Sequence, residues 1–306
     1  MKQSKTVLLT TIYPAAKNFM DSFFESLQKQ TYKNFDILVI NDGFKNFSSH
    51  KTQYSDLNLI EILSSESPAK NREVGIKKVI ELGYKFLIFG DSDDFFSENR
   101  IQESIKALKH NDIVINELTL YKDDNYCVDN FLKNNLDDTN PLNENIIDGN
   151  IFGFSNIAIR VNIIEQPIDF NSQIIAVDWF FISTLFLQNK WLNIIFLKDV
   201  VTYYRQYNSN TIGYSLMLDR KKLDMGLKVK YIHYMTLINY CEKYNYNNLI
   251  GVYKEKFKQI KNLNKKLINK SFKNKYICVV NSNIDKIFSG WWSEIIMLED
   301  FYNYEN

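Results

Sequence analysis

Residues 84–96 read YKFLIFGDSDDFF, an apolar run that ends abruptly in acidic residues. The run itself is Phe86 to Phe89, and the acids that follow are Asp91, Asp93 and Asp94. A continuous apolar run of this kind is typical of a strand buried on both faces of a parallel sheet. The acids therefore follow the carboxyl end of a strand, which is the edge where open α/β sheets bind ligands.

Carboxylates this close together repel one another unless a cation lies between them. A divalent metal ion that carries a phosphate is a common solution to this repulsion. The alternative is a polar turn in which Asp94 or Ser97 caps the next helix, since both residue types accept hydrogen bonds from helix N-termini. The residues alone leave both interpretations open.

Strand-like and helix-like segments alternate along the N-terminal part of the chain. β-Branched and apolar runs predict strands, and apolar residues at helical spacing predict helices. The expected strands cover residues 6–12, 35–40, 57–63 and 86–89, and the expected helices cover residues 17–30, 67–82 and 98–108. This alternation predicts βαβ units around a mostly parallel sheet, and hence the α/β fold class.

The pattern changes after residue 110. We expect strands at 112–121, 191–196 and 200–204, a strand or bend at 151–160, a polar loop or short elements at 122–150, and a helix at 177–188. From about residue 215 onward the sequence indicates mainly helix.

Composition argues against several classes of protein. The 306 residues carry 37 Lys and Arg against 36 Asp and Glu, so no overall charge favours nucleic acid as a partner. Cys127, Cys241 and Cys278 are far apart and indicate neither a disulfide framework nor a zinc site. The apolar stretch 174–187 is interrupted by Asp178 and is too short to span a bilayer. We therefore expect a cytoplasmic protein without a signal peptide.

A basic segment lies near the C-terminus. Nine lysines and one acid, Glu255, lie between Lys254 and Lys275, with apolar residues at helical spacing. One interpretation is peripheral contact with the inner face of the cell membrane, because a basic amphipathic helix can lie on an anionic surface. The other is a helix packed on its own domain with a solvated lysine face. The aromatic tail at Gly290–Trp292 could equally form a homo-oligomer interface.

The order of the motifs resembles that of family 2 glycosyltransferases over about residues 5–215. Residues 25–42 resemble the family pattern SLxxQTYxxxEIIVVDDGS, and residues 67–76 resemble its xxxARNxGI helix start. Residues 91–94 match its DxD motif, and residues 177–180 lie where the family has its ED pair. Each motif alone is weak, whereas four in the right order are a strong signal.

The resemblance implies a GT-A fold, in which a Rossmann-like, mostly parallel sheet is flanked by helices. Residues 1–215 would form the nucleotide-sugar-binding and catalytic domain, and residues 216–306 a mainly helical C-terminal region. The implied activity is inverting, metal-dependent transfer of a sugar from a UDP- or dTDP-sugar to a hydroxyl of a glycan or lipid-linked acceptor. The implied pathway is synthesis of a bacterial surface polysaccharide.

Such a transfer needs charge stabilisation on the leaving diphosphate, which Mn²⁺ or Mg²⁺ supplies, and a base for the acceptor hydroxyl. The resemblance implies that Asp93 ligates the metal, that Asp91 holds the ribose or the metal, and that Asp94 lies nearby. It also implies that Asp178 is the general base and that Trp179 lies at the acceptor. The alternative for Asp178 is a helix N-cap before an aromatic run.

Binding of the nucleotide sugar falls to a larger set of residues in this resemblance. The set is Thr11, Tyr13, Asp42, Lys70, Asn71, Asp91, Ser92 and Arg205. Asp42 would accept a hydrogen bond from the base, and Thr11 and Tyr13 would line the nucleotide pocket. Arg205 would contact the diphosphate or the acceptor.

The sequence departs from the family pattern in four places. Residues 12–15 replace its PTYN, Lys70 replaces the Arg of ARN, Val177 replaces the Glu of the ED pair, and Tyr207 replaces the His of the YRxHxxNxS segment at 203–211. These departures motivate an alternative, a catalytically silent nucleotide-binding module in a glycan assembly complex. A sugar nucleotidyltransferase is a further alternative, although the first strand is not followed by the Gly-rich loop typical of that class.

Overall fold

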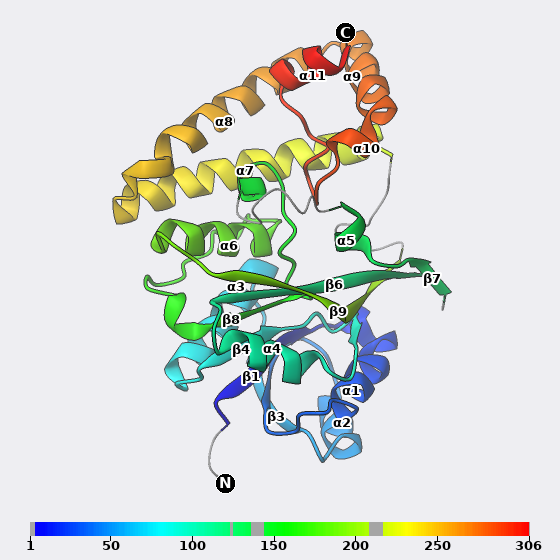
Figure 1. Cartoon of the computed structure of the whole chain (residues 1–306), viewed down its shortest axis with the longest axis vertical. Helices are drawn as coiled ribbons and strands as arrows, with labels where there is room; N and C mark the ends of the chain where they lie inside the picture. The colour runs from blue at the N-terminus through cyan, green and yellow to red at the C-terminus, as the bar shows by residue number, and fades with distance from the viewer. Residues whose placement is uncertain (1–3, 123–124, 136–143, 208–216, 306) are drawn as a thin grey trace. The chain divides into compact units, whose positions relative to one another are not determined.

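The computed structural model describes residues 4–122, 125–135, 144–207 and 217–305. These residues form one nine-stranded sheet with the order β3-β2-β1-β4-β8-β6-β9-β5, and β7 pairs with β6 (Figure 1). The strands are β1 (Thr6–Ile12), β2 (Asp36–Asp42), β3 (Asn58–Ser64), β4 (Phe86–Phe89), β5 (Phe95–Phe96), β6 (Ile113–Lys122), β7 (Asn125–Val128), β8 (Ile157–Arg160) and β9 (Ile194–Gln206).

Helices lie on both faces of this sheet and make up most of the C-terminal part of the chain. The α-helices are α1 (Met20–Gln28), α2 (Phe47–Gln53), α3 (Pro68–Glu81), α4 (Arg100–Leu108), α5 (Phe131–Asn135), α6 (Val177–Gln188), α7 (Arg220–Tyr244), α8 (Asn247–Leu267), α9 (Lys270–Ser282), α10 (Ile284–Ile287) and α11 (Leu298–Glu305). The short 3₁₀ helices are η1 (Pro14–Asn18), η2 (Glu144–Ile147) and η3 (Val161–Ile163).

The N-terminal half of the sheet is parallel. Strand β1 lies between β2 and β4, so that Leu9 is opposite both Leu38 and Phe89, and β3 extends the parallel arrangement. Beyond β4 the sheet is mixed, since β8 runs antiparallel to β4 and β6 while β9 runs parallel to β6. The expected α/β fold class is confirmed. Because β1, β2 and β4 are parallel, their carboxyl ends meet at one edge of the sheet.

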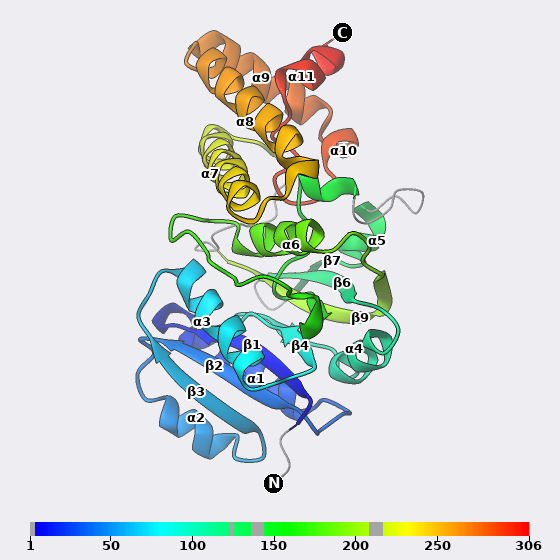
Figure 2. The ribbon, with the colours of Figure 1, turned by 90° about the vertical axis from the view of Figure 1, so that its left-hand side faces the viewer.

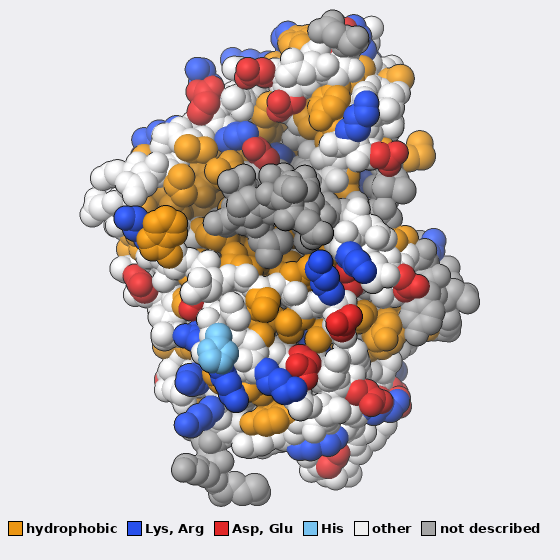
Figure 3. Space-filling model, viewed as in Figure 1, with side chains coloured by type: hydrophobic (Ala, Val, Ile, Leu, Met, Phe, Trp, Pro, Cys, Tyr) orange, Lys and Arg blue, Asp and Glu red, His pale blue; other side chains and the backbone are white. Residues whose placement is uncertain are grey.

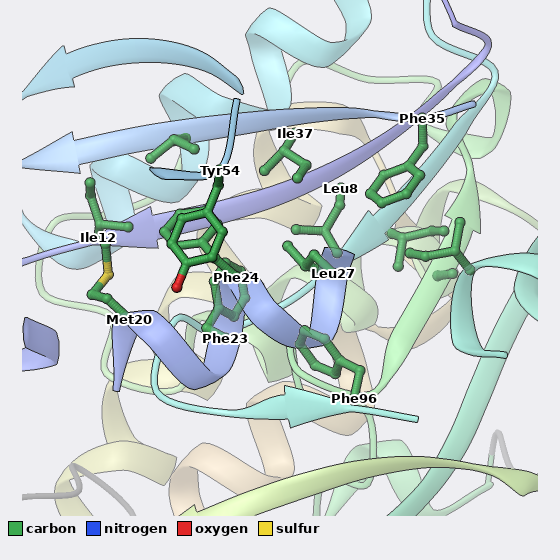
Figure 4. Packing of buried hydrophobic residues seen from close by; sticks show 14 of the residues in the cluster. Leu8, Ile12, Met20, Phe23, Phe24, Leu27, Phe35, Ile37, Tyr54 and Phe96 are labelled. Carbon is green, nitrogen blue, oxygen red and sulfur yellow. The ribbon is translucent and has the colours of Figure 1, made fainter. Parts of the chain in front are cut away.

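Helix α1 covers one face of this parallel part. The side chains of Phe23, Phe24 and Leu27 are fully buried, and they pack with Leu8 and Ile37 from the strands (Figure 4). These apolar residues recur at helical spacing, which is why the segment folds as an amphipathic helix. Burying a side chain of this size contributes roughly 1.5–3 kcal/mol, so this layer holds β1 and its carboxyl end firmly in place.

Helix α3 covers the opposite face, where a glycine allows close contact. A Cβ atom at Gly75 would lie 2.6 Å from Cδ1 of Leu9 and 3.2 Å from Cγ1 of Ile40. The helix begins as expected, with Pro68 in its first turn and with the side chain of Ser67 accepting a backbone hydrogen bond. Because α3 follows β3 directly, its first turn lies at the carboxyl edge of the sheet.

One expectation for the later strands was wrong. Residues 191–196 and 200–204 do not form two short strands, because β9 is a single strand along β6. The register shifts between Asn116 and Glu117 of β6, which leaves residues 198–200 of β9 without partners in the ladder. Lys198 and Asp199, which are among these unpaired residues, are charged and exposed. They interrupt the apolar pattern that predicts a strand.

Two further differences concern the helices near the N-terminus. The helix expected at residues 17–30 is the 3₁₀ helix η1 followed by α1. Helix α2 was not expected, since Phe47 is the one buried residue within it and gives no apolar periodicity to detect. Helices at 67–82, 98–108 and 177–188 are confirmed within two residues at each end by α3, α4 and α6.

The chain divides into two compact units, which we describe separately. The first comprises Met1–Asn134, Phe152–Ser172 and Gln188–Asn210, and the second comprises Asn135–Ile151, Gln173–Leu187 and Thr211–Asn306. The second unit contains the expected C-terminal helices, and within it α7 and α8 pack together through a hairpin at Asn245 (Figure 2). The domain boundary expected at residue 215 lies outside the described residues.

Many side chains of the basic segment in α8 and α9 are paired with acids. The acid-paired lysines are Lys254, Lys256, Lys258, Lys273 and Lys275. Acidic and basic side chains are interspersed on the face shown in Figure 3. Among the described residues, no helix combines the length and the hydropathy that a bilayer span requires. Contact of this segment with a membrane surface stays a prediction.

Candidate functional site

The acidic residues form a tight turn directly after β4, which we call the acid turn (residues 91–94). The amide of Gly90 donates a 3.1 Å hydrogen bond to the carbonyl of Leu9, and the amide of Asp94 donates a 3.1 Å bond to the carbonyl of Asp91. The buried hydroxyl of Ser92 donates a 2.8 Å bond to the carbonyl of Thr11. The acid turn is therefore fastened to the carboxyl end of β1.

Gly90 is required by the close packing beneath this turn. A Cβ atom at this position would lie 2.9 Å from Cζ of Phe96 and 3.6 Å from Cδ1 of Leu8. The side chains of Ser92 and Thr11, both expected at the nucleotide, are buried. The buried hydroxyl of Thr11 has no hydrogen-bond partner in the described part of the chain.

Asp93 is held by two tyrosines. The hydroxyl of Tyr207, which directly follows β9, donates a 2.5 Å hydrogen bond to Oδ2 of Asp93, and the hydroxyl of Tyr13 donates a 3.4 Å bond to the same oxygen. Burial raises the pKa of Asp93, the charge of Asp91 raises it further, and the bond from Tyr207 opposes both effects. A cation at this carboxylate would also lower its pKa, because opposite charge favours the ionised form.

Asp91 carries the more accessible carboxylate of the turn, with 29% of its side chain exposed. Its Oδ1 forms an ion pair with Nη2 of Arg72, which extends from α3. The guanidinium lies 5.2 Å from the ring centroid of Phe154, and its buried Nη1 has no hydrogen-bond partner among the described residues. Arg72 therefore places a positive charge with a free donor beside the acids.

Arg72 was missed at the sequence level, although a signal was present. We matched the family pattern ARNxGI on Ala69, which put Lys70 at the position of its arginine. In that pattern the arginine lies three residues before the glycine, and Arg72 lies three residues before Gly75. Since Gly75 is fixed by its contact with β1, it is the better anchor for the match.

Lys70 and Asn71 make contacts within the fold. Nζ of Lys70 lies 2.7 Å from Glu73 and 3.2 Å from Asp169. The side chain of Asn71 is fully buried, and its Oδ1 accepts a 2.6 Å hydrogen bond from the hydroxyl of Ser64 at the end of β3. Asn71 therefore shapes the connection between β3 and α3, and Lys70 fixes α3 to a neighbouring loop.

Asp94 faces the interior of the first unit and is 1% exposed. Its Oδ1 accepts a 2.8 Å hydrogen bond from the amide of Arg205, and burial together with the charges of Asp93 and Asp91 raises its pKa well above the ordinary range. Nε of Arg205 donates a 2.9 Å bond to the carbonyl of Asp93. Arg205 thus supports the acid turn through its backbone and through its side chain.

A second buried arginine lies behind the turn. Arg100 is fully buried, and its Nη2 donates a 2.6 Å hydrogen bond to the carbonyl of Phe89 at the end of β4. Burial lowers the pKa of Arg100 to about 9, while the charges of Asp94 and Asp91 act in the opposite direction. This cation partly offsets the repulsion among the acids, and no pattern in the sequence assigned it that role.

Asp42 is the last residue of β2, where the sequence placed it. It is half-buried and lies opposite Ser64 of β3 in the parallel ladder. Because β2 is the neighbour of β1, Asp42 lies at the same edge of the sheet as the acid turn. Its expected role at the nucleotide base stays a prediction.

Asp178 and Trp179 belong to the second unit, at the start of α6. Oδ1 of Asp178 accepts a 2.7 Å hydrogen bond from the amide of Trp179. The ring of Trp179 is fully buried and stacks on His233 with a centroid distance of 3.7 Å. Trp179 is therefore core of its own unit, which does not support its expected place at an acceptor. The expected role of Asp178 stays a prediction.

The acid turn suits a hard divalent cation in one respect. Mg²⁺ in phosphate-binding sites is commonly held by one or two carboxylates, with substrate phosphates completing its coordination. Asp91 and Asp93 supply such a pair. The described residues contain no group of three or more His, Cys, Asp and Glu side chains placed to hold a metal ion.

Comparison with known proteins identifies relatives of this arrangement. Residues 9–160 match the model of the family described as glycosyl transferase family 2. An uncharacterized glycosyltransferase of Rickettsia bellii is 28% identical over 127 residues, which are 40% of this chain and 18% of that protein. One from Rickettsia felis is 32% identical over 108 residues, covering 34% and 17%. The chain thus matches less than a fifth of the length of these curated relatives.

Two solved structures share the fold. TarS of S. aureus, residues 1–349 with UDP-GlcNAc, has a TM-score of 0.57 at 15% identity, over 86% of this chain and 73% of that chain. The mannosyltransferase PcManGT from Pyrobaculum calidifontis, solved with GDP-Man and Mn²⁺, has a TM-score of 0.50 at 13% identity, over 78% and 65%. At these identities the likeness concerns the fold, and it confirms the expected GT-A architecture.

Proposed function

We propose that this chain, of which residues 9–160 match glycosyl transferase family 2, transfers a sugar from a nucleotide diphosphate sugar to a hydroxyl. The observation that carries this proposal is the arrangement of Asp91, Asp93 and Arg72 at the carboxyl edge of the parallel strands. Two carboxylates and a guanidinium with a free N–H suit a diphosphate and its counter-ion.

In this proposal Asp93 and Asp91 hold Mn²⁺ or Mg²⁺, which when bound supplies positive charge to the leaving diphosphate. Arg72 donates its free Nη1–H to a phosphate oxygen, taking the role that we first expected for Lys70. Tyr207 keeps Asp93 in one orientation and favours its ionised form. Arg205 holds the turn in shape, and Asp94 serves as a buried acceptor for the amide of Arg205.

The acceptor chemistry rests on the resemblance. Asp178 takes the proton from the acceptor hydroxyl, and direct attack of that hydroxyl inverts the anomeric centre. The donor is a UDP- or dTDP-sugar, whose base is read by Asp42, Thr11 and Tyr13. The acceptor is a glycan or lipid-linked hydroxyl, and the product belongs to a bacterial surface polysaccharide. A GDP-sugar is the competing donor, since PcManGT was solved with GDP-Man.

A screen of nucleotide sugars with Mn²⁺ tests the donor part of this proposal. Specific binding stabilises the folded state by mass action, so a UDP-, dTDP- or GDP-sugar should raise the melting temperature in the presence of metal. Release of free nucleotide diphosphate in the same mixtures then reports turnover.

One specific observation favours a second candidate, a nucleotide-binding module without turnover. Both accessible acids already have partners inside the chain, because Tyr207 bonds to Asp93 and Arg72 pairs with Asp91. Donor binding without release of nucleotide diphosphate, with or without acceptor, would favour this candidate over the enzyme.

A further inference from the structure

The apolar face of α8 is occupied by its own unit. The apolar side chains that recur at helical spacing are buried in the second unit, where α8 packs on α7. They are Tyr253, Ile260, Leu263 and Leu267. A helix that lies flat on a bilayer inserts such a face among the lipids, so α8 cannot bind in the way that its sequence pattern indicates. A surface contact of α8 has to use the other side of the helix.

The other side of α8 carries a stripe of lysines whose pairing changes along the helix. Its members are exposed and recur every three or four residues, at Lys254, Lys258, Lys261 and Lys265. Side chains at this spacing lie along one side of a helix. The first two have acid partners, Glu242 at 3.0 Å and Glu255 at 3.5 Å. The last two form no ion pair with a described residue, and residues 256–284 contain no Asp or Glu.

The stripe ends in an exposed apolar side chain at the turn between α8 and α9. Ile268 is 80% exposed, and it follows Lys265 by three residues, on the same side of the helix. Lys266 and Lys270 flank it and are also exposed. This turn lies at the opposite end of α8 from the hairpin with α7 (Figure 2). We call Lys261, Lys265, Ile268 and Lys270 the α8–α9 tip.

Lys270 lies where the helix itself disfavours a cation. It is the first residue of α9, and the first turn of α9 contains no acid. The N-terminus of a helix carries partial positive charge, so a lysine there is unfavourable and an anion is favourable. Lys273 in the same turn is paired with Asp224, whereas Lys270 forms no ion pair within the described part of the chain. The tip therefore combines lysines that lack acid partners with the positive end of a helix.

We propose that the α8–α9 tip binds the surface of an anionic lipid bilayer, with its lysines among the head groups and Ile268 inserted beneath them. Charge complementarity supplies the attraction, since each basic residue near such a surface strengthens binding by about fivefold. The exposed Ile268 favours a bilayer over a nucleic acid, because lipid takes up an apolar side chain and a phosphate backbone does not. The tip contains no residue assigned to the donor or the acceptor, so this proposal stands apart from the proposed function.

Flotation of the full chain with vesicles tests the proposal without nucleotide, metal or acceptor. The vesicles are made of phosphatidylcholine alone or with about one third phosphatidylglycerol, which gives the surface a negative potential. The chain should float with the mixed vesicles and not with phosphatidylcholine alone. Added NaCl should weaken the binding, because salt screens the attraction between the lysines and the surface.

Two pairs of lysines on the same helix separate the tip from a general effect of charge. Lys261→Gln/Lys265→Gln should weaken binding to the mixed vesicles by about 10–30-fold, as expected for two basic residues. Lys254→Gln/Lys258→Gln removes the same charge from the same side of α8, but each of these lysines is already paired with an acid. This matched control should weaken binding by no more than about threefold.

Ile268→Asn provides a second test that leaves every lysine in place. It should remove the part of the binding that survives at high salt, because that part depends on insertion of an apolar side chain. All the replaced side chains are exposed, so the melting temperatures should stay at the wild-type value.

Three results would overturn the proposal. The first is equal flotation, or no flotation, with the two kinds of vesicle. The second is equal weakening of binding by the two lysine pairs. The third is unchanged vesicle binding by Ile268→Asn together with tighter binding of the wild type to a short DNA duplex, which would make the tip a site for polyanions instead.

Discussion

The hydroxyl of Tyr207 donates a 2.5 Å hydrogen bond to Oδ2 of Asp93, and Tyr207 stands where the family pattern has a histidine. Burial raises the pKa of the Tyr207 phenol, and the charge of Asp93 raises it further. The phenol therefore stays a neutral donor under conditions in which a histidine would change its charge. This chain thus orients its acidic residue with a hydrogen bond that does not depend on the titration of the donor.

Tyr207→Phe should make donor binding more sensitive to acid. The bond from Tyr207 opposes the rise in the pKa of Asp93, so its removal raises that pKa further and protonates the carboxylate at a higher pH. The pH midpoint for loss of metal-dependent donor binding should move upward by about 0.5–1 unit, given about 0.5–1.5 kcal/mol for the bond and about 1.4 kcal/mol per pKa unit. Calorimetric titrations across pH measure this midpoint.

Tyr13→Phe is the matched control for this change. Its hydroxyl lies 3.4 Å from the same oxygen, so the midpoint should move less than in Tyr207→Phe. An unchanged midpoint in Tyr207→Phe would show that the hydrogen bond does not set the charge of Asp93.

Substitutions of Arg72 and of Lys70 should have very different effects on the affinity for the nucleotide-sugar donor. Arg72→Ala removes a cation with a free N–H beside Asp91, so the Kd for a nucleotide sugar should rise by about 10–100-fold, as expected for one charge-assisted hydrogen bond. Lys70→Ala removes a partly exposed ion pair with Glu73 and Asp169, and should lower the free energy of unfolding by no more than about 1 kcal/mol.

Isothermal titration of both variants with the same donor measures this difference. Arg72→Lys should recover only part of the affinity, because lysine keeps the charge but loses the planar fork. If Lys70→Ala weakened donor binding more than Arg72→Ala did, Lys70 rather than Arg72 would be the residue that binds the donor phosphate.

Asp94→Asn should remove part of the pH dependence of stability. The folded-state pKa of Asp94 is raised by burial and by Asp93 and Asp91, whereas the unfolded pKa is about 3.9. Between these values the folded chain binds more protons than the unfolded chain, so stability falls as pH rises toward the folded pKa. Asparagine keeps an acceptor for the amide of Arg205 but carries no charge.

Urea unfolding from pH 4 upward checks this prediction. The wild type should lose more stability than Asp94→Asn over the rise in pH, and donor binding should survive in the variant because Asp94 is buried. Equal pH slopes in the two proteins, or loss of metal-dependent binding in Asp94→Asn, would argue that Asp94 is ionised and acts at the metal.

Asp178→Asn should separate binding from transfer. If Asp178 is the general base, its amide replacement leaves the donor Kd unchanged and lowers kcat by about 10²–10⁴-fold. The measurement compares donor titration with release of nucleotide diphosphate in the presence of an acceptor. Equal loss of both would indicate a structural role at the start of α6, where Asp178 already accepts a bond from the amide of Trp179.

The parallel half of the fold was predictable because strands that are buried on both faces consist mainly of apolar and β-branched residues. The strands β1 and β4 are buried along their whole lengths, so β4 appears as an unbroken apolar run and β1 as a run of β-branched and apolar residues. β9 was less readable, since an irregularity brings two exposed charged residues into the strand. Helix α2 was not predicted, because Phe47 is its single apolar residue and one residue cannot show helical periodicity.

The location of the candidate site in the fold was predictable from the sequence, whereas most of the contacts between its side chains were not. The acids were found because they end a buried strand. The bond from Tyr207 to Asp93 joins residues 114 positions apart, and no local pattern reports such a contact. Arg72 was overlooked because the motif was anchored on Ala69 rather than on Gly75, whose packing against β1 fixes the position of the helix.

Titration of a nucleotide sugar into the wild type and into Asp93→Asn, each with and without Mn²⁺, tests the proposed donor site most directly. The wild type should bind at least one UDP-, dTDP- or GDP-sugar in a metal-dependent manner. Asp93→Asn should fold normally and lose the metal-dependent part of the affinity. Failure of every such donor to bind the wild type with metal, or equal metal-dependent binding by Asp93→Asn, would refute the assignment of the acid turn as the donor site.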